Sequence, residues 1–299
     1  MASPLYMFNR KYHVRSISLP SRSHPTTLKI EEELNKLKSW ELTSTLSFES
    51  IGVGLSGLED VYGCLDELLN MSATRQVLSQ NKQEKCINEL LDSSVQLLDV
   101  CGIARDLVSQ VKEHVQILQS ALRRRKGDLS VETCLSYYTN FRKKAKKDAK
   151  RLSGALKQME SRFAPLVNQD DHFLAVMRVL REAGDFSISI FQSILSPLSG
   201  PVSSPKQSRW SLISRLIHKG VITCEERQES ENELQYVDDA LSVLLKNLSG
   251  DEPRAENVQI VQKQLKDLEK SLGSLDEGLE SIFRQLIRSR ASLLNIISQ

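Results

Sequence analysis

A dense run of basic residues in the middle of the chain is the strongest chemical signal in this sequence. Between residues 123 and 151, eleven basic side chains stand against three acidic ones. The basic positions are Arg123, Arg124, Arg125, Lys126, Arg142, Lys143, Lys144, Lys146, Lys147, Lys150 and Arg151. On a helix, most of those after residue 142 fall on the face opposite Ala145, Ala149 and Leu152, with Arg142 as a charged exception on the apolar face. This pattern predicts a surface that can bind phosphate or carboxylate groups.

Four interpretations of this basic region stay open on sequence grounds. It can be a solvated helix face that keeps the protein soluble, or a site for an acidic protein partner. It can also attach the protein to anionic lipid, where each basic residue near the surface contributes about 1 kcal/mol. Nucleic-acid binding or nuclear import is the least favoured, because the formal net charge is only +2 and a nucleic-acid binder is normally far more basic.

A short motif in the N-terminal region predicts a phosphorylation site. Arg15 stands three residues before Ser18, and Pro20 stands two residues after it. A basophilic kinase can use the arginine, and a phosphate on Ser18 could then bind the arginine cluster of a 14-3-3-type reader. The alternatives are an uncommitted tail and a transit peptide, because residues 1–25 are rich in Arg and Ser and hold no Asp or Glu.

The sequence contains no constellation typical of catalysis or metal binding, and we expect no enzyme, metal site or cofactor. Adjacent acidic residues such as Asp238 and Asp239 point about 100° apart on a helix, so we expect solvated faces or caps rather than a paired acid and base. The five cysteines and five histidines are dispersed without metal-ligand spacing. We expect reduced thiols, with Cys101 a small buried apolar residue. The common phosphate-binding, zinc-protease and nucleophile-elbow motifs are missing.

Two heptad seams predict the elements that carry these residues. Their apolar or small residues alternate at spacings of four and three, which keeps one line of a helix facing a partner helix. The first seam contains Leu90, Ser94, Leu97, Cys101, Ala104, Val108, Val111, Val115, Leu118 and Leu122. The second contains Val258, Val261, Leu265, Leu268, Leu272, Leu275, Leu279, Ile282, Leu286, Leu293 and Ile296. They predict an all-α fold, an elongated helical bundle with coiled-coil-like long helices over residues 82–126 and 255–297. These two helices can lie antiparallel, and their seams can pair within one chain or between chains, so a homo-oligomer stays open.

The remaining sequence divides into a tail, a bundle, a linker and C-terminal helices. Residues 1–25 are expected to form a disordered, basic, Ser-rich tail, and residues 26–195 an N-terminal helical bundle. Residues 196–209 hold three prolines and five serines, which favours a linker or loop. Residues 210–299 are expected to pack back on the bundle as C-terminal helices.

Composition favours packed aliphatic layers over a carved pocket. Leu, Val and Ile dominate, whereas aromatic residues make up 5% of the chain. No stretch approaches 18 apolar residues, so we expect no transmembrane span. We expect a cytoplasmic protein, with a plastid or a peripheral membrane location as the alternatives.

Several stretches of the chain resemble the plant BYPASS-related family. They are RSISLPSRSHP at residues 15–25, GLEDVYGCLDELL at 57–69, ELLDSSVQLLDVCGIARD at 89–106 and VKEHVQILQSALRRRKG at 111–127. The resemblance spans almost the whole chain. It implies an all-helical protein without enzymatic activity that acts in root and shoot development, with no catalytic residues to carry over. We therefore expect a helical interaction protein with protein partners, and a peripheral protein on anionic lipid as the alternative.

Overall fold

The computed structural model describes residues 25–45, 47–124, 128–159, 171–200, 233–247 and 255–299. Within these residues the chain forms eight α-helices and no strand, which confirms the predicted all-α fold. The helices are α1 (Pro25–Thr43), α2 (Phe48–Leu69), α3 (Ser72–Gln80), α4 (Lys85–Arg124), α5 (Asp128–Met159), α6 (Asp171–Ser199), α8 (Glu233–Asn247) and α9 (Ala255–Ile297). Residues 1–24 of the predicted tail and 201–209 of the predicted linker lie outside the described part, whereas Pro25 is the first residue of α1.

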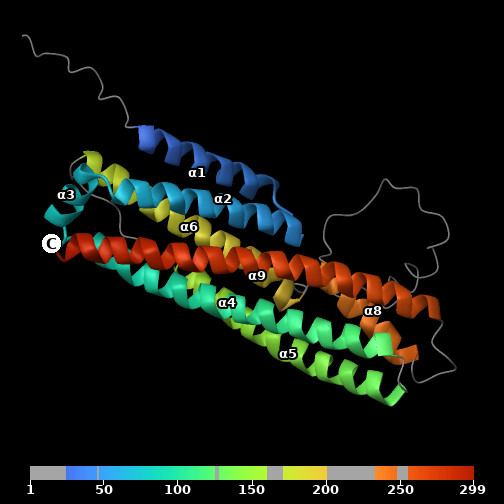
Figure 1. The fold of residues 1–299 in the computed structure, drawn as a ribbon. Helices are drawn as coiled ribbons and strands as arrows, with labels where there is room; N and C mark the ends of the chain where they lie inside the picture. Colours follow the sequence, from blue (N-terminus) through green and yellow to red (C-terminus); the bar gives the residue numbers. More distant parts are fainter. Residues whose placement is uncertain (1–24, 46, 125–127, 160–170, 201–232, 248–254) are drawn as a thin grey trace, which may run out of the picture.

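The helices α4 and α9 run side by side along most of the bundle (Figure 1). The Gln119 side chain donates to Glu269 at 2.9 Å, and the Cys101 thiol lies 3.6 Å from the carbonyl oxygen of Leu279. Residue numbers fall along α9 as they rise along α4, so the two helices are antiparallel. At 43 residues, α9 is about 65 Å long.

The two predicted seams are the buried edges of α4 and α9. Apart from Ser94 and Val258, which are half-buried, every residue of both seams is buried. A spacing that averages 3.5 residues keeps such a line facing its neighbours over many turns. The seams of α4 and α9 therefore meet within one chain.

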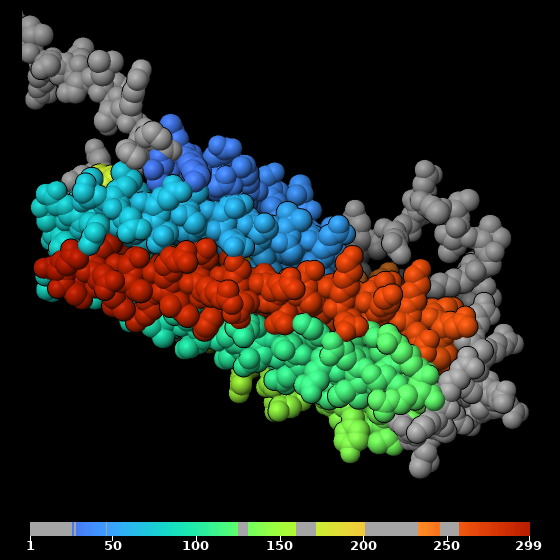
Figure 2. Space-filling model, viewed as in Figure 1, coloured from blue at the N-terminus to red at the C-terminus, as the bar shows by residue number. Residues whose placement is uncertain are grey.

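The other helices build layers around this pair. The helix α9 packs against α4, α2 and α8, while α6 packs against α5, α2 and α4. The helix α1 covers α2 at one margin of the bundle, and α5 lies beside α4 at the other (Figure 1). A single cluster of buried residues includes members of all eight helices. The C-terminal helix thus completes a core that the earlier helices share, and it is the long ridge across the face seen in Figure 2.

The end of α6 lies later in the chain than the predicted start of the linker. The helix continues through Ser199 and contains Pro197 in its last turn, where Leu198 is buried. It stops at Gly200, whose φ of 78° is readily adopted only by glycine. The residues 196–199 are therefore helix, because the buried side of α6 outweighs the poor helix propensity of proline near a helix end.

Close packing between α1 and α2 depends on a glycine. A Cβ atom on Gly54 would lie 2.5 Å from Cζ2 of Trp40. The indole is held in place, because its Nε1 donates to the Ser50 carbonyl oxygen at 2.8 Å. An alanine at position 54 must therefore push the two helices apart or displace the ring.

We expect Gly54→Ala to lower the free energy of unfolding by about 1–3 kcal/mol, because it overpacks this contact. The control is Gly63→Ala on the same helix, where a Cβ atom meets nothing within 4 Å. That change should stabilise the protein by about 0.5–1 kcal/mol through helix propensity. Urea unfolding followed by circular dichroism measures both, and equal stability of the two variants would contradict the packing argument.

Candidate functional site

The predicted basic residues fall into two groups rather than one patch. Arg123 and Arg124 lie in the last turn of α4, and the others that the structure describes lie from Arg142 to Arg151 in the middle and later part of α5. About 22 Å of helix separates Asp128, the first residue of α5, from Lys143. Arg125 and Lys126 lie outside the described residues.

From its middle onward, α5 carries an exposed line of basic side chains, here named the α5 basic stripe. Its members are Lys143, Lys144, Lys147, Lys150, Arg151 and Lys157, all exposed. The opposite face of the helix is buried through Ala145, Ala149 and Leu152. The sequence prediction did not include Lys157, because the dense basic run stops at residue 151. Lys157 nevertheless follows Lys150 at the heptad spacing of seven residues.

Arg142 does not belong to this surface, which corrects the prediction. Its relative exposure is 4%, and its guanidinium group binds both carboxylate oxygens of Asp238 on α8 at 2.9–3.2 Å. It also donates to the Leu198 carbonyl oxygen at 3.3 Å, near the end of α6. Arg142 therefore joins α5 to α6 and α8 instead of facing a partner.

Asp238 is an internal anchor rather than the solvated residue that we predicted. Besides Arg142, it accepts a hydrogen bond of 2.7 Å from the Tyr138 hydroxyl and pairs with Lys146 at 3.4 Å. Burial, followed by the charge of Asp238, raises the pKa of Tyr138 well above its ordinary value. Three side chains of α5 thus converge on one carboxylate, which offsets the cost of removing it from water.

Four acidic residues form a line along α4, here named the α4 acidic row, and one of them, Asp106, lies beside α5. The row contains Asp92, Asp99, Asp106 and Glu113, all exposed. Their spacing of seven residues puts them on one line of the helix. Sequence reasoning missed this row because it followed the apolar seam alone, although the seven-residue repeat is visible in the sequence.

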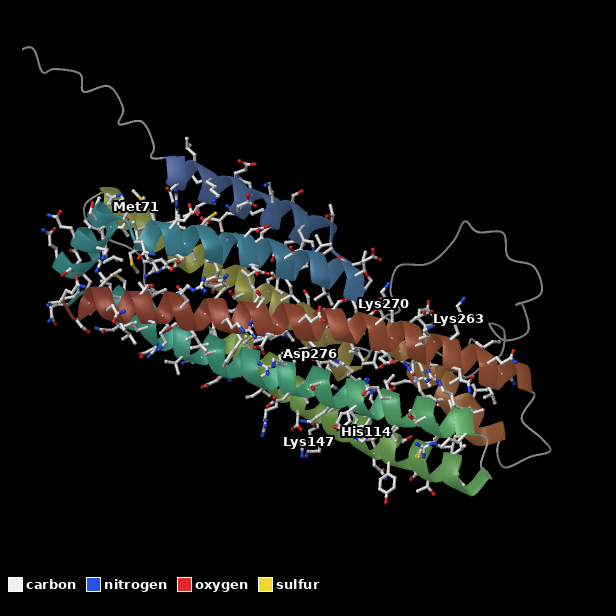
Figure 3. All side chains as sticks on the ribbon, viewed as in Figure 1. Met71, His114, Lys147, Lys263, Lys270 and Asp276 are labelled. Carbon is white, nitrogen blue, oxygen red and sulfur yellow. The ribbon has the colours of Figure 1, made fainter. Side chains whose placement is uncertain are left out.

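A small hollow of about 170 Å³ lies where the two helices meet. Asp106 lines it from α4, and Lys144, Asp148 and Arg151 line it from α5. Figure 3 marks His114 of α4 and Lys147 of α5 along this margin. Asp106 of α4 thus lies beside Lys144 and Arg151 of α5, an arrangement suited to binding a surface that carries both charges.

His114 and Phe141 set the register between α4 and α5. Their rings stack with centroids 4.0 Å apart. Burial lowers the pKa of His114 more than the charge of neighbouring Glu113 raises it. The folded state therefore favours the neutral imidazole.

We expect this shift to make the protein less stable in mild acid. Because the unfolded imidazole has a pKa near 6.5 and the folded one a lower pKa, the unfolded state takes up the proton first. The stabilisation is complete above about pH 6.5 and is lost as the pH falls through the folded pKa. Urea unfolding at pH 7.5 and pH 5.5 should show a smaller pH effect for His114→Gln than for the native protein; an unchanged slope would exclude His114 as the cause.

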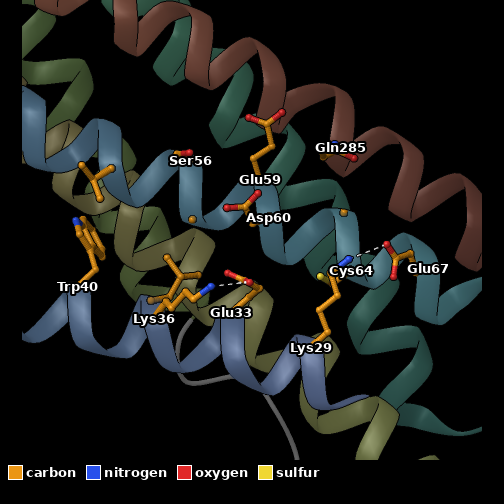
Figure 4. A pocket seen from close by; sticks show the side chains of 14 residues that line it. Lys29, Glu33, Lys36, Trp40, Ser56, Glu59, Asp60, Cys64, Glu67 and Gln285 are labelled. Atoms are coloured by element: carbon orange, nitrogen blue, oxygen red, sulfur yellow. Dashed lines mark hydrogen bonds and ion pairs between the residues drawn. The ribbon is translucent and has the colours of Figure 1, made fainter. Parts of the chain in front are cut away.

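An open groove of about 710 Å³ lies between α1 and α2 (Figure 4). Two ion pairs line it, Lys29 with Glu67 and Lys36 with Glu33, each at 2.9 Å. Burial raises the pKa of Cys64 at its floor, so that thiol is held protonated. Two lysines stand against four acidic side chains in the groove, since Glu59 and Asp60 line it in addition to the paired Glu33 and Glu67. Its lining is therefore net acidic and presents no activated nucleophile.

The remaining candidates give no catalytic or metal-binding geometry within the described residues. No group of three or more His, Cys, Asp or Glu side chains there could hold a metal ion. Cys101 is buried as predicted, and burial raises the pKa of its thiol to about 12. Arg15, Ser18 and Pro20 lie outside the described residues. No helix that the structure describes is both long and apolar enough to cross a membrane.

The fold and the charged margin define an all-helical protein with exposed, oppositely charged helix faces. Comparison with family models identifies the group: the model described as Protein BPS1 matches residues 54–296. The chain therefore belongs to the BPS1 family, in agreement with the resemblance seen in the sequence. No curated protein matches the chain, and neither does any solved structure.

Proposed function

We propose that this protein is a non-enzymatic interaction protein of plants that acts in root and shoot development. The developmental role is inferred from membership of the BPS1 family and from the resemblance noted in the sequence. The interaction role is supported by one observation: the α5 basic stripe and the α4 acidic row leave two charged helix faces exposed on a well-packed bundle. We expect the protein to work in the cytoplasm through protein partners bound at these faces.

Proximity labelling in root tissue tests this proposal. The full chain, fused at its C-terminus, is compared with a variant in which Lys143, Lys147 and Lys150 are changed to Gln. A discrete set of protein neighbours that is lost or reduced at least fivefold in the variant supports a partner at this margin. The control changes Lys263 and Lys270, exposed on α9 (Figure 3), to Gln. Identical neighbours in all three proteins would contradict the assignment of the partner site.

A second candidate function is peripheral attachment to anionic lipid. The α5 basic stripe supports it, since several exposed basic residues near a membrane contribute about 1 kcal/mol each. Sedimentation with phosphatidylserine vesicles at 50 mM and 500 mM NaCl is the test. Binding that is lost at high salt and in the Lys143/Lys147/Lys150 variant supports attachment, because salt screens such charges. Absence of binding at low salt removes this candidate.

The N-terminal motif supports a separate partner. If Ser18 is phosphorylated, Arg15 and Pro20 place it in a sequence that a 14-3-3-type reader can bind. Phosphorylated full-length protein should bind such a reader, and Ser18→Ala should not. Equal binding by both proteins would contradict this assignment.

A further inference from the structure

The α4 acidic row and the α5 basic stripe together form one surface, here named the α4–α5 margin. This surface is complementary in charge to itself. Its acidic side chains lie on α4 and its basic side chains lie on α5, side by side along two antiparallel neighbours. Within the described part of the chain, the carboxylates of Asp106 and Glu113 form no ion pair with α5. A surface that carries both halves of a charge pattern can bind a second copy of itself.

The two charge rows also match in height along the helices. His114 lies opposite Phe141, and because the helices are antiparallel, seven residues back along α4 correspond to seven residues forward along α5. Glu113 is therefore level with Lys143, Asp106 with Lys150 and Asp99 with Lys157, each within one residue. One residue corresponds to about 1.5 Å of rise, so the acidic and basic rows share the same register over three levels.

Symmetry then selects one way for two copies to meet. A two-fold axis parallel to the helices places α4 of one copy over α5 of the other, so that acidic residues lie over basic ones at equal heights. A two-fold axis across the helices would place α4 over α4 and acid over acid, which is repulsive. The first arrangement produces a four-helix layer in which facing helices are antiparallel, as in common helical bundles.

Apolar side chains on the same margin supply contact area between the charges. Ile103 and Ile117 on α4 are 42% and 45% exposed, and Tyr137 on α5 is 67% exposed. Two helices about 10 Å wide over 25 residues present roughly 750 Å² per copy. That area is close to the ~800 Å² per partner of a standard interface.

We infer that this protein forms a homodimer through the α4–α5 margin, with the α4 acidic row of each copy against the α5 basic stripe of the other. The inference goes beyond the proposed function by naming a second copy as the occupant of this face. The dimer would cover the residues that would contact a membrane, and it would also occupy the faces at which we propose that protein partners bind. A different partner would then have to replace the second copy at this surface.

Two charge-reversed proteins provide the test, each made in the full chain. One carries Asp106→Lys and Glu113→Lys on α4, and the other carries Lys143→Glu and Lys150→Glu on α5. Each alone should self-associate at least tenfold more weakly than the native protein in sedimentation equilibrium at 50 mM NaCl. Mixed in equal amounts, they should form a heterodimer of near-native affinity, because each reversed face then meets its complement.

Matched reversals on α9 control for net charge and folding. They are Lys263→Glu with Lys270→Glu, and Asp267→Lys with Glu277→Lys, all at exposed positions. These controls should dimerise as the native protein does. A native protein that stays monomeric up to 100 µM at 50 mM NaCl would overturn the inference, as would a mixture that associates no better than its separate components.

The outcome also separates this inference from the proposed function. A monomeric native protein that binds anionic vesicles through the α5 basic stripe would overturn the dimer and assign the stripe to lipid. A monomeric protein that keeps margin-dependent neighbours in root tissue would overturn the dimer and leave the interaction role standing. Rescue in the mixture supports the dimer whatever the proximity labelling shows.

Discussion

Changing Leu268 to Asp should abolish cooperative folding. Leu268 lies in the α9 seam at 1% exposure. Removing a buried leucine side chain alone costs about 2–5 kcal/mol, and a buried carboxylate without a partner adds a further penalty. Because domains are stable by only about 5–15 kcal/mol, we expect most helical signal in far-ultraviolet circular dichroism to be lost at 37 °C.

The matched control is Ile287→Asp on the same helix, where the side chain is 48% exposed. It introduces the same charged group and should change the free energy of unfolding by less than about 1 kcal/mol. Leu97→Asp in the α4 seam, at 4% exposure, should behave like Leu268→Asp. Cooperative melting of both seam variants near the native temperature would show that the seams are not the core.

Arg142→Met should lower the free energy of unfolding by about 3 kcal/mol. Removing one partner of a buried ion pair typically costs about 3–5 kcal/mol, because the remaining charge stays buried. The lower value applies here, since Lys146 also pairs with Asp238 at 3.4 Å. The same change at Arg151, whose side chain is 81% exposed, should shift stability by no more than about 0.5 kcal/mol.

A second substitution tests whether the buried charge is the cause. Adding Asp238→Asn to Arg142→Met removes the carboxylate charge, which only the half-buried Lys146 still partners, and keeps an oxygen that can accept the Tyr138 hydrogen bond. The double variant should therefore be more stable than Arg142→Met alone, as measured by urea unfolding. The single variant Asp238→Asn completes the comparison. If the free-energy changes of Arg142→Met and Asp238→Asn sum to that of the double variant, the two side chains do not act as a pair.

Much of the local structure follows from periodicity that the sequence displays. The seams predicted the two longest helices to within three residues at each end, because a 3.5-residue apolar repeat has few other folded solutions. The exposure of Lys143, Lys147 and Lys150 was also predictable. They lie on the helix face opposite the buried Ala145, Ala149 and Leu152. In these cases, the residues that show which face of the helix is buried lie within a few turns of one another along the chain.

Arg142 shows what sequence could not decide. It directly precedes the exposed Lys143 and Lys144 in the sequence, and its partner Asp238 is 96 residues away. The helical spacing put Arg142 on the apolar face, but only the packing of α8 against α5 supplies its partner and makes an internal ion pair out of a residue assigned to the basic patch. Arg142 also donates a hydrogen bond to the Leu198 carbonyl oxygen, which adds a contact at the end of α6.

The sequence by itself determined the helices, their buried lines and the family, because each depends on repeats or motifs within a continuous stretch. The tertiary structure alone decided which charges are exposed together. It separated Arg123 and Arg124 from the α5 basic stripe, because an antiparallel hairpin places them at the opposite end from Lys150. It also placed Asp106 beside that stripe, since the contact depends on the register of α4 against α5.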